Sequence, residues 1–123
     1  MKKSNSATPS AANSFESYCP DAGEIIWLEL SPVRGQEQDG RRPVLVLSPE
    51  SYNRVAKLCV VCAMTTKAKG YPFEVKMPDG NVVLADQVRT VAWPSRGSEF
   101  KAEAPVSVVT EVRAKLKALV AIS

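Results

Sequence analysis

Short apolar runs separated by turn-forming residues are the feature that most limits what this chain can fold into. The longest apolar run without a charge is Leu58–Thr66, nine residues, whereas a membrane-spanning helix needs about 20. The runs are rich in valine, isoleucine and leucine and are bounded by Gly, Pro, Asn, Asp and Ser, which is typical of strands joined by tight turns. The sequence therefore predicts no membrane span and a mainly β domain.

The individual runs predict which segments are strands. Pro43–Ser48 is almost continuously apolar, as expected of a strand buried on both faces. Phe73–Met77 alternates apolar and charged residues, which indicates a half-exposed strand. The turn Pro78–Asn81 carries a strong hairpin signal. The other predicted strands are Glu24–Leu30, Leu58–Met64, Asn81–Leu84 and Val88–Trp93, and Pro49–Arg54 is predicted to form a short helical turn.

One amphipathic helix is predicted near the C-terminus, with Pro105 in its first turn. Its apolar face is formed by Val108, Val112, Leu116, Leu119 and Val120, and its solvent side by Glu111, Arg113, Lys115 and Lys117. Several short strands and one terminal helix predict a small barrel or strongly bent antiparallel sheet with a helix packed on it. The 123 residues suit a single domain. Residues 1–17 are polar and predicted to be a disordered tail, leaving 18–123 as the folded domain.

Charge and histidine content limit the chemistry. The net charge of +3 is too small to identify a nucleic-acid partner by itself. Histidine is absent from the sequence, which excludes histidine-dependent zinc sites, Ser-His-Asp and Cys-His triads, and ribonuclease chemistry built on a histidine pair. The acidic residues show no metal-binding spacing. No metal or cofactor is therefore expected.

The three cysteines predict a reducing compartment. Lys2 and Lys3 resemble the start of a signal peptide, but 4–14 lacks the apolar stretch that must follow, so a cytoplasmic protein is expected. Cys59 and Cys62 form a C-x-x-C motif, but no second pair completes a zinc site. Three residues apart on a strand, they lie on opposite faces. We interpret them as packed, reduced thiols.

Three polar segments are candidates for the functional site. The loop 34–42 contains Arg34, Glu37, Asp39, Arg41 and Arg42 between two buried strands, and Pro43 biases Arg42 toward an extended conformation. The second follows a buried strand and contains Thr65, Thr66, Lys67 and Lys69, whose hydroxyls and ammonium groups suit phosphate. The third contains Asp86, Gln87 and Arg89. The alternative interpretations are a solvated charged turn for the first segment, β-favouring threonines that end a strand for the second, and ordinary strand-end polarity for the third.

Together these segments resemble the MazF/PemK/Kid toxin family, and its MazF branch most. The resemblance runs from about residue 21 to the end and keeps the family's order of motifs. The segments that carry it are GEIIW at 23–27, SPVRGQEQDGRRPVLVLSP at 31–49, YN at 52–53, TTKAKGYPFEV at 65–75, LADQVR at 84–89 and AW at 92–93.

The resemblance implies an SH3-like barrel, a homodimer, and metal-independent cleavage of single-stranded RNA to a 2′,3′-cyclic phosphate and a 5′-hydroxyl. It implies catalytic roles for Arg42, Thr65 and Glu37. In this chemistry the 2′-hydroxyl attacks phosphorus, Arg42 stabilises the phosphorane and Thr65 donates to a non-bridging oxygen. The guanidinium pKa exceeds about 12, so the general base stays open between Arg42, Glu37 and a partner-chain group. RNA-binding roles are predicted for Arg34, Arg41, Thr66, Lys67, Lys69, Asp86, Gln87 and Arg89.

Two departures from the family pattern add positive charge near the scissile phosphate. Arg41 stands where many members have histidine, and Lys67 where glutamine is common. A cognate antitoxin, similar to MazE and with an acidic C-terminal segment, is the expected protein partner. The alternatives are a non-enzymatic gyrase-poisoning toxin of CcdB type and an SH3-like adaptor module. Both leave the arginine loop and the threonine pair unexplained.

Overall fold

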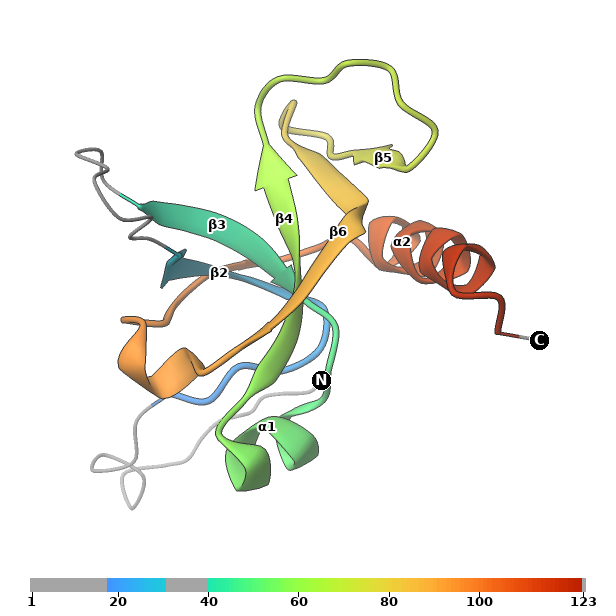
Figure 1. The fold of residues 1–123 in the computed structure, drawn as a ribbon. Coiled ribbons are helices and arrows are strands. Elements are labelled where there is room, and N and C mark those ends of the chain that lie inside the picture. The colour runs from blue at the N-terminus through green and yellow to red at the C-terminus, as the bar shows by residue number, and fades with distance from the viewer. Residues whose placement is uncertain (1–17, 31–39, 123) are drawn as a thin grey trace.

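A six-stranded antiparallel sheet forms the body of the protein (Figure 1), in the order β5-β6-β4-β3-β2-β7. The computed structural model describes residues 18–30 and 40–122. In chain order the elements are β2 (Glu24–Glu29), β3 (Arg41–Val46), α1 (Glu50–Ala56), β4 (Cys59–Thr65), β5 (Glu74–Lys76), β6 (Val82–Val91), the 3-10 helix η2 (Trp93–Ser95), β7 (Glu99–Glu103) and α2 (Val106–Leu119). The predicted mainly β fold with a C-terminal helix is confirmed. The predicted tail 1–17 and most of the loop after β2, 31–39, lie outside the described residues.

The two faces of the sheet bury two separate hydrophobic clusters. On one face, Val108 and Val112 of α2 pack with residues such as Ile25, Leu45 and Val83. The other face buries a second cluster, made by Cys19, Ile26, Leu28, Val44, Val46, Cys59, Val61, Val91 and Trp93. Successive residues of a strand point to opposite faces, so a strand between two clusters must be apolar at nearly every position. This explains the continuous apolar run of β3.

Helix α1 is fixed to the sheet by a buried polar network around Asn53. Its side-chain amide donates to the carbonyls of Pro20 and Ser48, both at 2.9 Å, and its Oδ1 accepts from the Ser48 hydroxyl at 2.6 Å. The indole of Trp93 donates to the Asn53 carbonyl at 3.0 Å. Asn53 has no exposed surface, and these bonds satisfy its amide.

The region predicted as two strands, Asn81–Leu84 and Val88–Trp93, is one strand, and this prediction was wrong. β6 runs through Ala85, Asp86 and Gln87 without a break. It pairs with β4 in two registers, Cys62 with Val88 and Met64 with Val83, so several extra β6 residues lie between these pairs. Such a bulge bends the strand. The polar residues that suggested a turn therefore mark the bend of a continuous strand.

Two other predictions need correction. β7 was not predicted, because its sequence EFKAE at 99–103 has one large apolar residue and lies at the edge of the sheet, paired with β2 alone. On α2, Leu119 and Val120 are about half exposed, although the apolar face was predicted to include them. Arg113 and Lys115, predicted on the solvent side, donate instead to the carbonyls of Leu47 and Pro72.

The interpretation of the C-x-x-C motif is confirmed. Cys59 and Cys62 are fully buried free thiols, and they belong to the two different clusters on opposite faces of β4. In the described part of the chain, no helix has the length and apolar character needed to cross a membrane.

Candidate active site

Arg42 and Thr65 belong to two neighbouring strands, Arg42 near the start of β3 and Thr65 at the end of β4. β3 pairs with β4 so that Val44 lies across from Ala63. This is the last pair of the ladder, two residues short of Arg42 and of Thr65, and Figure 1 shows the start of β3 and the end of β4 diverging beyond it. Since side chains two apart share a face, both lie on the face of Val44 and Ala63. The two motifs, which are well separated in the sequence, thus present Arg42 and Thr65 on the same face of the sheet.

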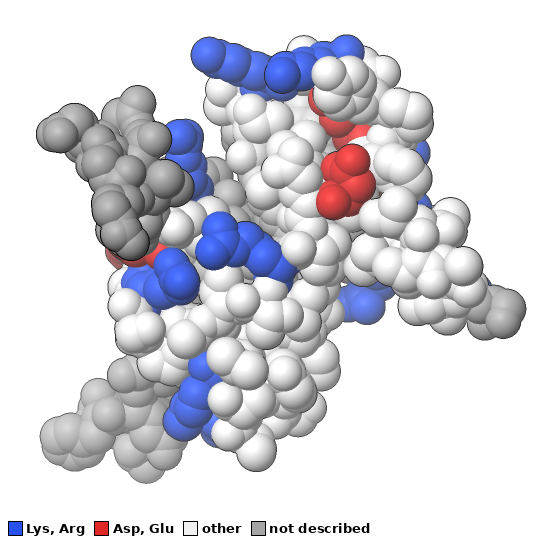
Figure 2. All heavy atoms as spheres, viewed as in Figure 1, with Lys and Arg blue, Asp and Glu red and all other residues white. Residues whose placement is uncertain are grey.

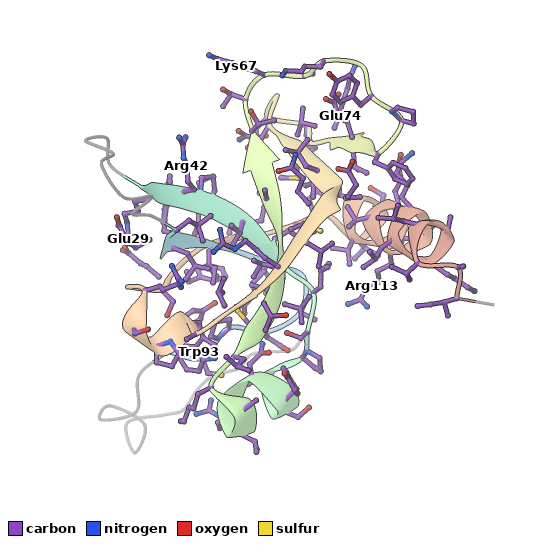
Figure 3. All side chains as sticks on the ribbon, in the orientation of Figure 1. Glu29, Arg42, Lys67, Glu74, Trp93 and Arg113 are labelled. Carbon is purple, nitrogen blue, oxygen red and sulfur yellow. The ribbon has the colours of Figure 1, made fainter. Side chains whose placement is uncertain are left out.

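A groove of about 460 Å³ opens beside Arg42 and extends across β4, where Ala63 and Met64, the residues just before Thr65, line it. Arg42 and Pro43 contribute one wall, and Gln87 and Arg89 of β6 contribute the other. Its remaining lining is apolar: Leu30, Ala63, Met64, Leu84 and Val88. Figure 3 shows Arg42 extending from the start of β3, on the side where the loop after β4 carries Lys67. A hollow with apolar walls and guanidinium groups at its rim suits nucleotides, which have flat bases and anionic phosphates.

The electrostatics of the groove favour an anionic ligand. The side chains of Arg42 and Arg89 are exposed at its rim, and Figure 2 shows basic side chains gathered around the hollow on this face of the molecule. Arg89 pairs in register with Val61, which places it on the same face of the sheet as Arg42. Two guanidinium groups on one face can bind successive phosphates or one phosphate bidentately.

Thr65 ends β4 half buried, and its hydroxyl oxygen accepts the backbone N–H of Lys67 at 3.1 Å. A hydroxyl that accepts one bond still has its own proton to donate. Thr66, Lys67 and Lys69 follow in the β4–β5 loop and are exposed. The predicted threonine and lysine segment therefore begins at the end of β4, the strand whose residues Ala63 and Met64 line the groove.

Arg41 is placed differently from Arg42, although the two are adjacent and both belong to β3 rather than to the loop in which they were predicted. Arg41 lies on the opposite face, where it donates to the Gly97 carbonyl at 3.0 Å and forms an ion pair with Glu99 of β7. Its side chain therefore does not share the groove face with Arg42, and its predicted role in RNA binding stays a prediction. Asp86 is exposed on the bulged part of β6. Arg34 and Glu37 lie outside the described residues.

The apolar lining of the groove was missed by sequence reasoning. Leu30, Met64, Leu84 and Val88 each stand at or near the end of a predicted strand, and none was predicted to line the site. The antiparallel order of the strands was the only available signal, since it brings the end of one strand beside the start of the next. Strand order alone does not place Leu84 and Val88 in one groove, because the bulge in β6 is also needed to bring them together.

The described residues contain no group of three His, Cys, Asp or Glu side chains arranged to hold a metal ion. Burial raises the pKa of Cys19 and Cys62 to about 11 and that of Cys59 to about 12. Thiols with such pKa values stay protonated near neutral pH and are poor nucleophiles. The cysteines are therefore packing residues, and the groups available for chemistry on the groove face are guanidinium, hydroxyl and amide groups.

The fold and this groove agree with one protein family. Residues 21–120 match the family model of PemK-like, MazF-like toxins of type II toxin-antitoxin systems. The chain belongs to this family. Among characterised relatives, the endoribonuclease toxin MazF of Escherichia coli K12 is 42% identical over 107 residues, which cover 84% of this chain and 96% of the relative. The endoribonuclease PemK of Escherichia coli is 35% identical over 108 residues, 80% of each chain.

A solved structure shares both fold and sequence. The MazE-MazF complex of Deinococcus radiodurans contains a chain that matches with a TM-score of 0.82 and 51% identity, covering 87% of this chain and all of the other. The MazF and PemK relatives carry the word endoribonuclease in their names, and the crystal structure pairs MazF with MazE.

Proposed function

We propose that this chain is a sequence-specific endoribonuclease that cleaves single-stranded RNA without a metal ion, as the toxin of a type II toxin-antitoxin system. The observation that carries the proposal is the groove that brings Arg42 of β3 together with Gln87 and Arg89 of β6, across the strand that ends at Thr65. The sequence contains no histidine, and the described residues contain no cluster of side chains that could hold a metal ion. The arginines of the groove are therefore the candidates for phosphate chemistry. The identities with two named endoribonucleases support the same conclusion.

In the proposed mechanism the 2′-hydroxyl of one nucleotide attacks the adjacent phosphorus and the 5′-oxygen leaves, giving a 2′,3′-cyclic phosphate and a 5′-hydroxyl. Arg42 stabilises the charge that develops on the equatorial oxygens. The Thr65 hydroxyl donates a hydrogen bond to a non-bridging oxygen. The candidates for the general base are Arg42, Glu37 and a group of a second protomer. DNA lacks the attacking hydroxyl and is bound without being cut.

RNA binding is proposed to extend beyond the reacting phosphate. Gln87 lines the groove beside Arg89, and its amide carries both a donor and acceptors for base edges. Lys67 and Lys69 extend the positive surface along the β4–β5 loop. Arg34, Arg41, Thr66 and Asp86 complete the proposed RNA-binding set; Arg41 can join it only through a second protomer or a rearrangement, since its side chain faces away from this groove.

The proposed partners are an antitoxin similar to MazE and a second copy of the chain. A MazE-MazF complex exists for the Deinococcus radiodurans relative. An extended acidic segment of the antitoxin suits a groove with basic residues at its rim and apolar walls. We propose that the protein acts in the cytoplasm, and its three free thiols are consistent with a reducing compartment. The gyrase-poisoning alternative is not favoured, because the named relatives are endoribonucleases.

The decisive experiment incubates the purified protein with a long single-stranded RNA and with DNA of the same sequence, in the presence of EDTA. We expect cleavage of RNA alone, at a limited set of sites, with cyclic phosphate ends detected by mass spectrometry. Arg42→Ala should greatly reduce the cleavage, and Lys117→Ala, an exposed change on α2 outside the lining of the groove, is the matched control for loss of a cation. Loss of activity in EDTA with recovery in magnesium would overturn the metal-independent mechanism, and intact RNA would overturn the function.

A further inference from the structure

The side chain of Glu74, at the start of β5, holds two successive backbone amides of the β4–β5 loop. Its Oε2 accepts the N–H of Lys69 at 2.9 Å and its Oε1 accepts the N–H of Gly70 at 3.0 Å. Figure 3 shows Glu74 beneath the loop that carries Lys67. Gly70 has φ of +81°, a conformation that other residues rarely adopt, so the loop turns where the carboxylate binds it.

Other contacts fix the two ends of the same loop. At its start, the hydroxyl of Thr65 accepts the N–H of Lys67. At its end, Lys115 of α2 donates to the Pro72 carbonyl at 2.7 Å, and the N–H of Ala85 donates to the Phe73 carbonyl at 2.9 Å. The middle of the loop, which carries Lys69 and Gly70, has the Glu74 carboxylate as its anchor. The Glu74 side chain therefore binds backbone amides of the loop, and the side chains of Lys67 and Lys69 are exposed to solvent.

By its charge alone, Glu74 should weaken RNA binding. A carboxylate beside two lysines lowers the positive potential that attracts phosphate. A carboxylate that accepts two N–H groups, however, forms charge-assisted hydrogen bonds. These bonds order the loop before the ligand arrives, so less conformational entropy is lost on binding. The geometric and the electrostatic effects of Glu74 therefore oppose each other, which makes them separable by experiment.

We propose that Glu74 is a positioning residue for RNA binding, which holds the β4–β5 loop so that Lys67 and Lys69 meet phosphates outside the scissile bond. The inference rests on the proposed endoribonuclease function. Glu74 does not touch the reacting groups in this scheme. It acts on substrate affinity through the two lysines and leaves the chemical step at Arg42 and Thr65 unchanged.

The test replaces Glu74 with glutamine. The Gln side chain keeps its size, but its carbonyl can accept one of the two amides while its NH₂ faces the other donor. For Glu74→Gln we expect KM for a short RNA to rise roughly three- to twentyfold, as expected when two exposed lysines no longer bind phosphate, with kcat changed less than about twofold. Affinity is measured directly with an RNA that carries a 2′-deoxy group at the cleaved nucleotide. Glu103→Gln, an exposed carboxylate on β7, is the control for the same change in net charge.

Two further measurements distinguish positioning from a general structural effect. The slope of log affinity against log salt should become shallower by about 0.7 for each phosphate that the lysines no longer neutralise. Added to the double variant Lys67→Gln/Lys69→Gln, Glu74→Gln should cause no further decrease in affinity, because residues that act through each other are not additive. The amide signals of Lys69 and Gly70 should shift in the NMR spectrum of Glu74→Gln while those of the core remain.

The possible results separate this inference from the function beneath it. RNA binding by Glu74→Gln that equals or exceeds that of the parent protein would overturn the positioning role while the parent still cuts RNA. So would an additive decrease in affinity on top of the lysine substitutions. A parent protein that neither binds nor cuts RNA would overturn the proposed function itself.

Discussion

Arg41 and Arg42 begin β3 side by side, and the alternation of the strand sends them to opposite faces of the sheet. Arg42 extends to the groove, while Arg41 binds Gly97 and Glu99. Both arginines were predicted to lie in one loop, and the family resemblance alone gave Arg42 a catalytic role and Arg41 an RNA-binding role. The assignment to a strand that starts at Arg41 separates them.

Replacing each arginine with alanine tests this difference. For Arg42→Ala we expect cleavage to fall by roughly a hundred- to a thousandfold, the usual effect of removing one donor to the transition state, with an unchanged melting temperature. For Arg41→Ala we expect most of the activity to remain and a small decrease in stability, because an exposed ion pair contributes at most about 1 kcal/mol. Rates on a labelled RNA and thermal unfolding measure both effects. Equal decreases in activity would mean that Arg41 shares the catalytic role.

Asn53 shows how a motif residue can be structural. The family resemblance singled out Tyr52 and Asn53 without giving them a role, and the structure buries Asn53 at the centre of hydrogen bonds with Pro20, Ser48 and Trp93. Sequence reasoning could not find this network, since Pro20 and Trp93 lie 33 and 40 residues from Asn53.

Replacing Asn53 with alanine is expected to lower the free energy of unfolding by about 2–4 kcal/mol, because buried polar partners lose their hydrogen bonds. The rate per folded molecule should stay close to that of the parent protein. Urea unfolding followed by tryptophan fluorescence measures the first effect, and Ser51→Ala, exposed on the same helix, is the control. A stable variant with greatly reduced activity would point to a role for Asn53 in the groove instead.

At the scale of elements, β3 and β4 were predictable and β6 and β7 were not. β3 and β4 pass between two hydrophobic clusters, so most of their positions are apolar and their signals are strong. β6 contains the polar run Asp86–Gln87 because it bulges past β4 toward solvent, and this resembles a turn when seen in sequence. β7 depends on pairing with β2 at the edge of the sheet. Such tertiary contacts leave little trace in local sequence.

The buried thiols of β4 make the stability of the folded protein decrease at high pH. Burial raises the pKa of Cys59 to about 12 and that of Cys62 to about 11, whereas in the unfolded chain thiols ionise near pH 8.5. The folded state therefore holds these protons at a pH where the unfolded state has lost them. Stability is unaffected below about pH 8 and falls as the pH rises above it, by up to about 1.4 kcal/mol per pH unit and thiol.

We expect urea midpoints to be constant between about pH 7 and 8 and to fall between about pH 9 and 10. Alkylation offers an independent check: the folded protein should resist iodoacetamide at about pH 8, and the unfolded protein should react at all three cysteines. Rapid alkylation of the folded protein, or a stability that does not change up to about pH 10, would show that the thiols are more accessible than the structure indicates.

For the molecule as a whole, basic residues and apolar residues meet in one groove on a chain with a net charge of only +3. RNA and an acidic antitoxin segment should compete for it, since both present negative charge. The two ligands should differ in how salt affects their affinity.

RNA binding releases counterions, so log affinity falls against log salt with a slope of about −0.7 for each neutralised phosphate. A peptide that also places apolar side chains against Leu30, Leu84 and Val88 keeps a contribution that salt does not screen. Titrations of a labelled RNA and of the antitoxin's C-terminal peptide from about 50 to 400 mM salt should therefore show affinity falling more steeply for the RNA. In competition, each should displace the other, and a ternary complex that still cleaves RNA would show that the antitoxin binds elsewhere.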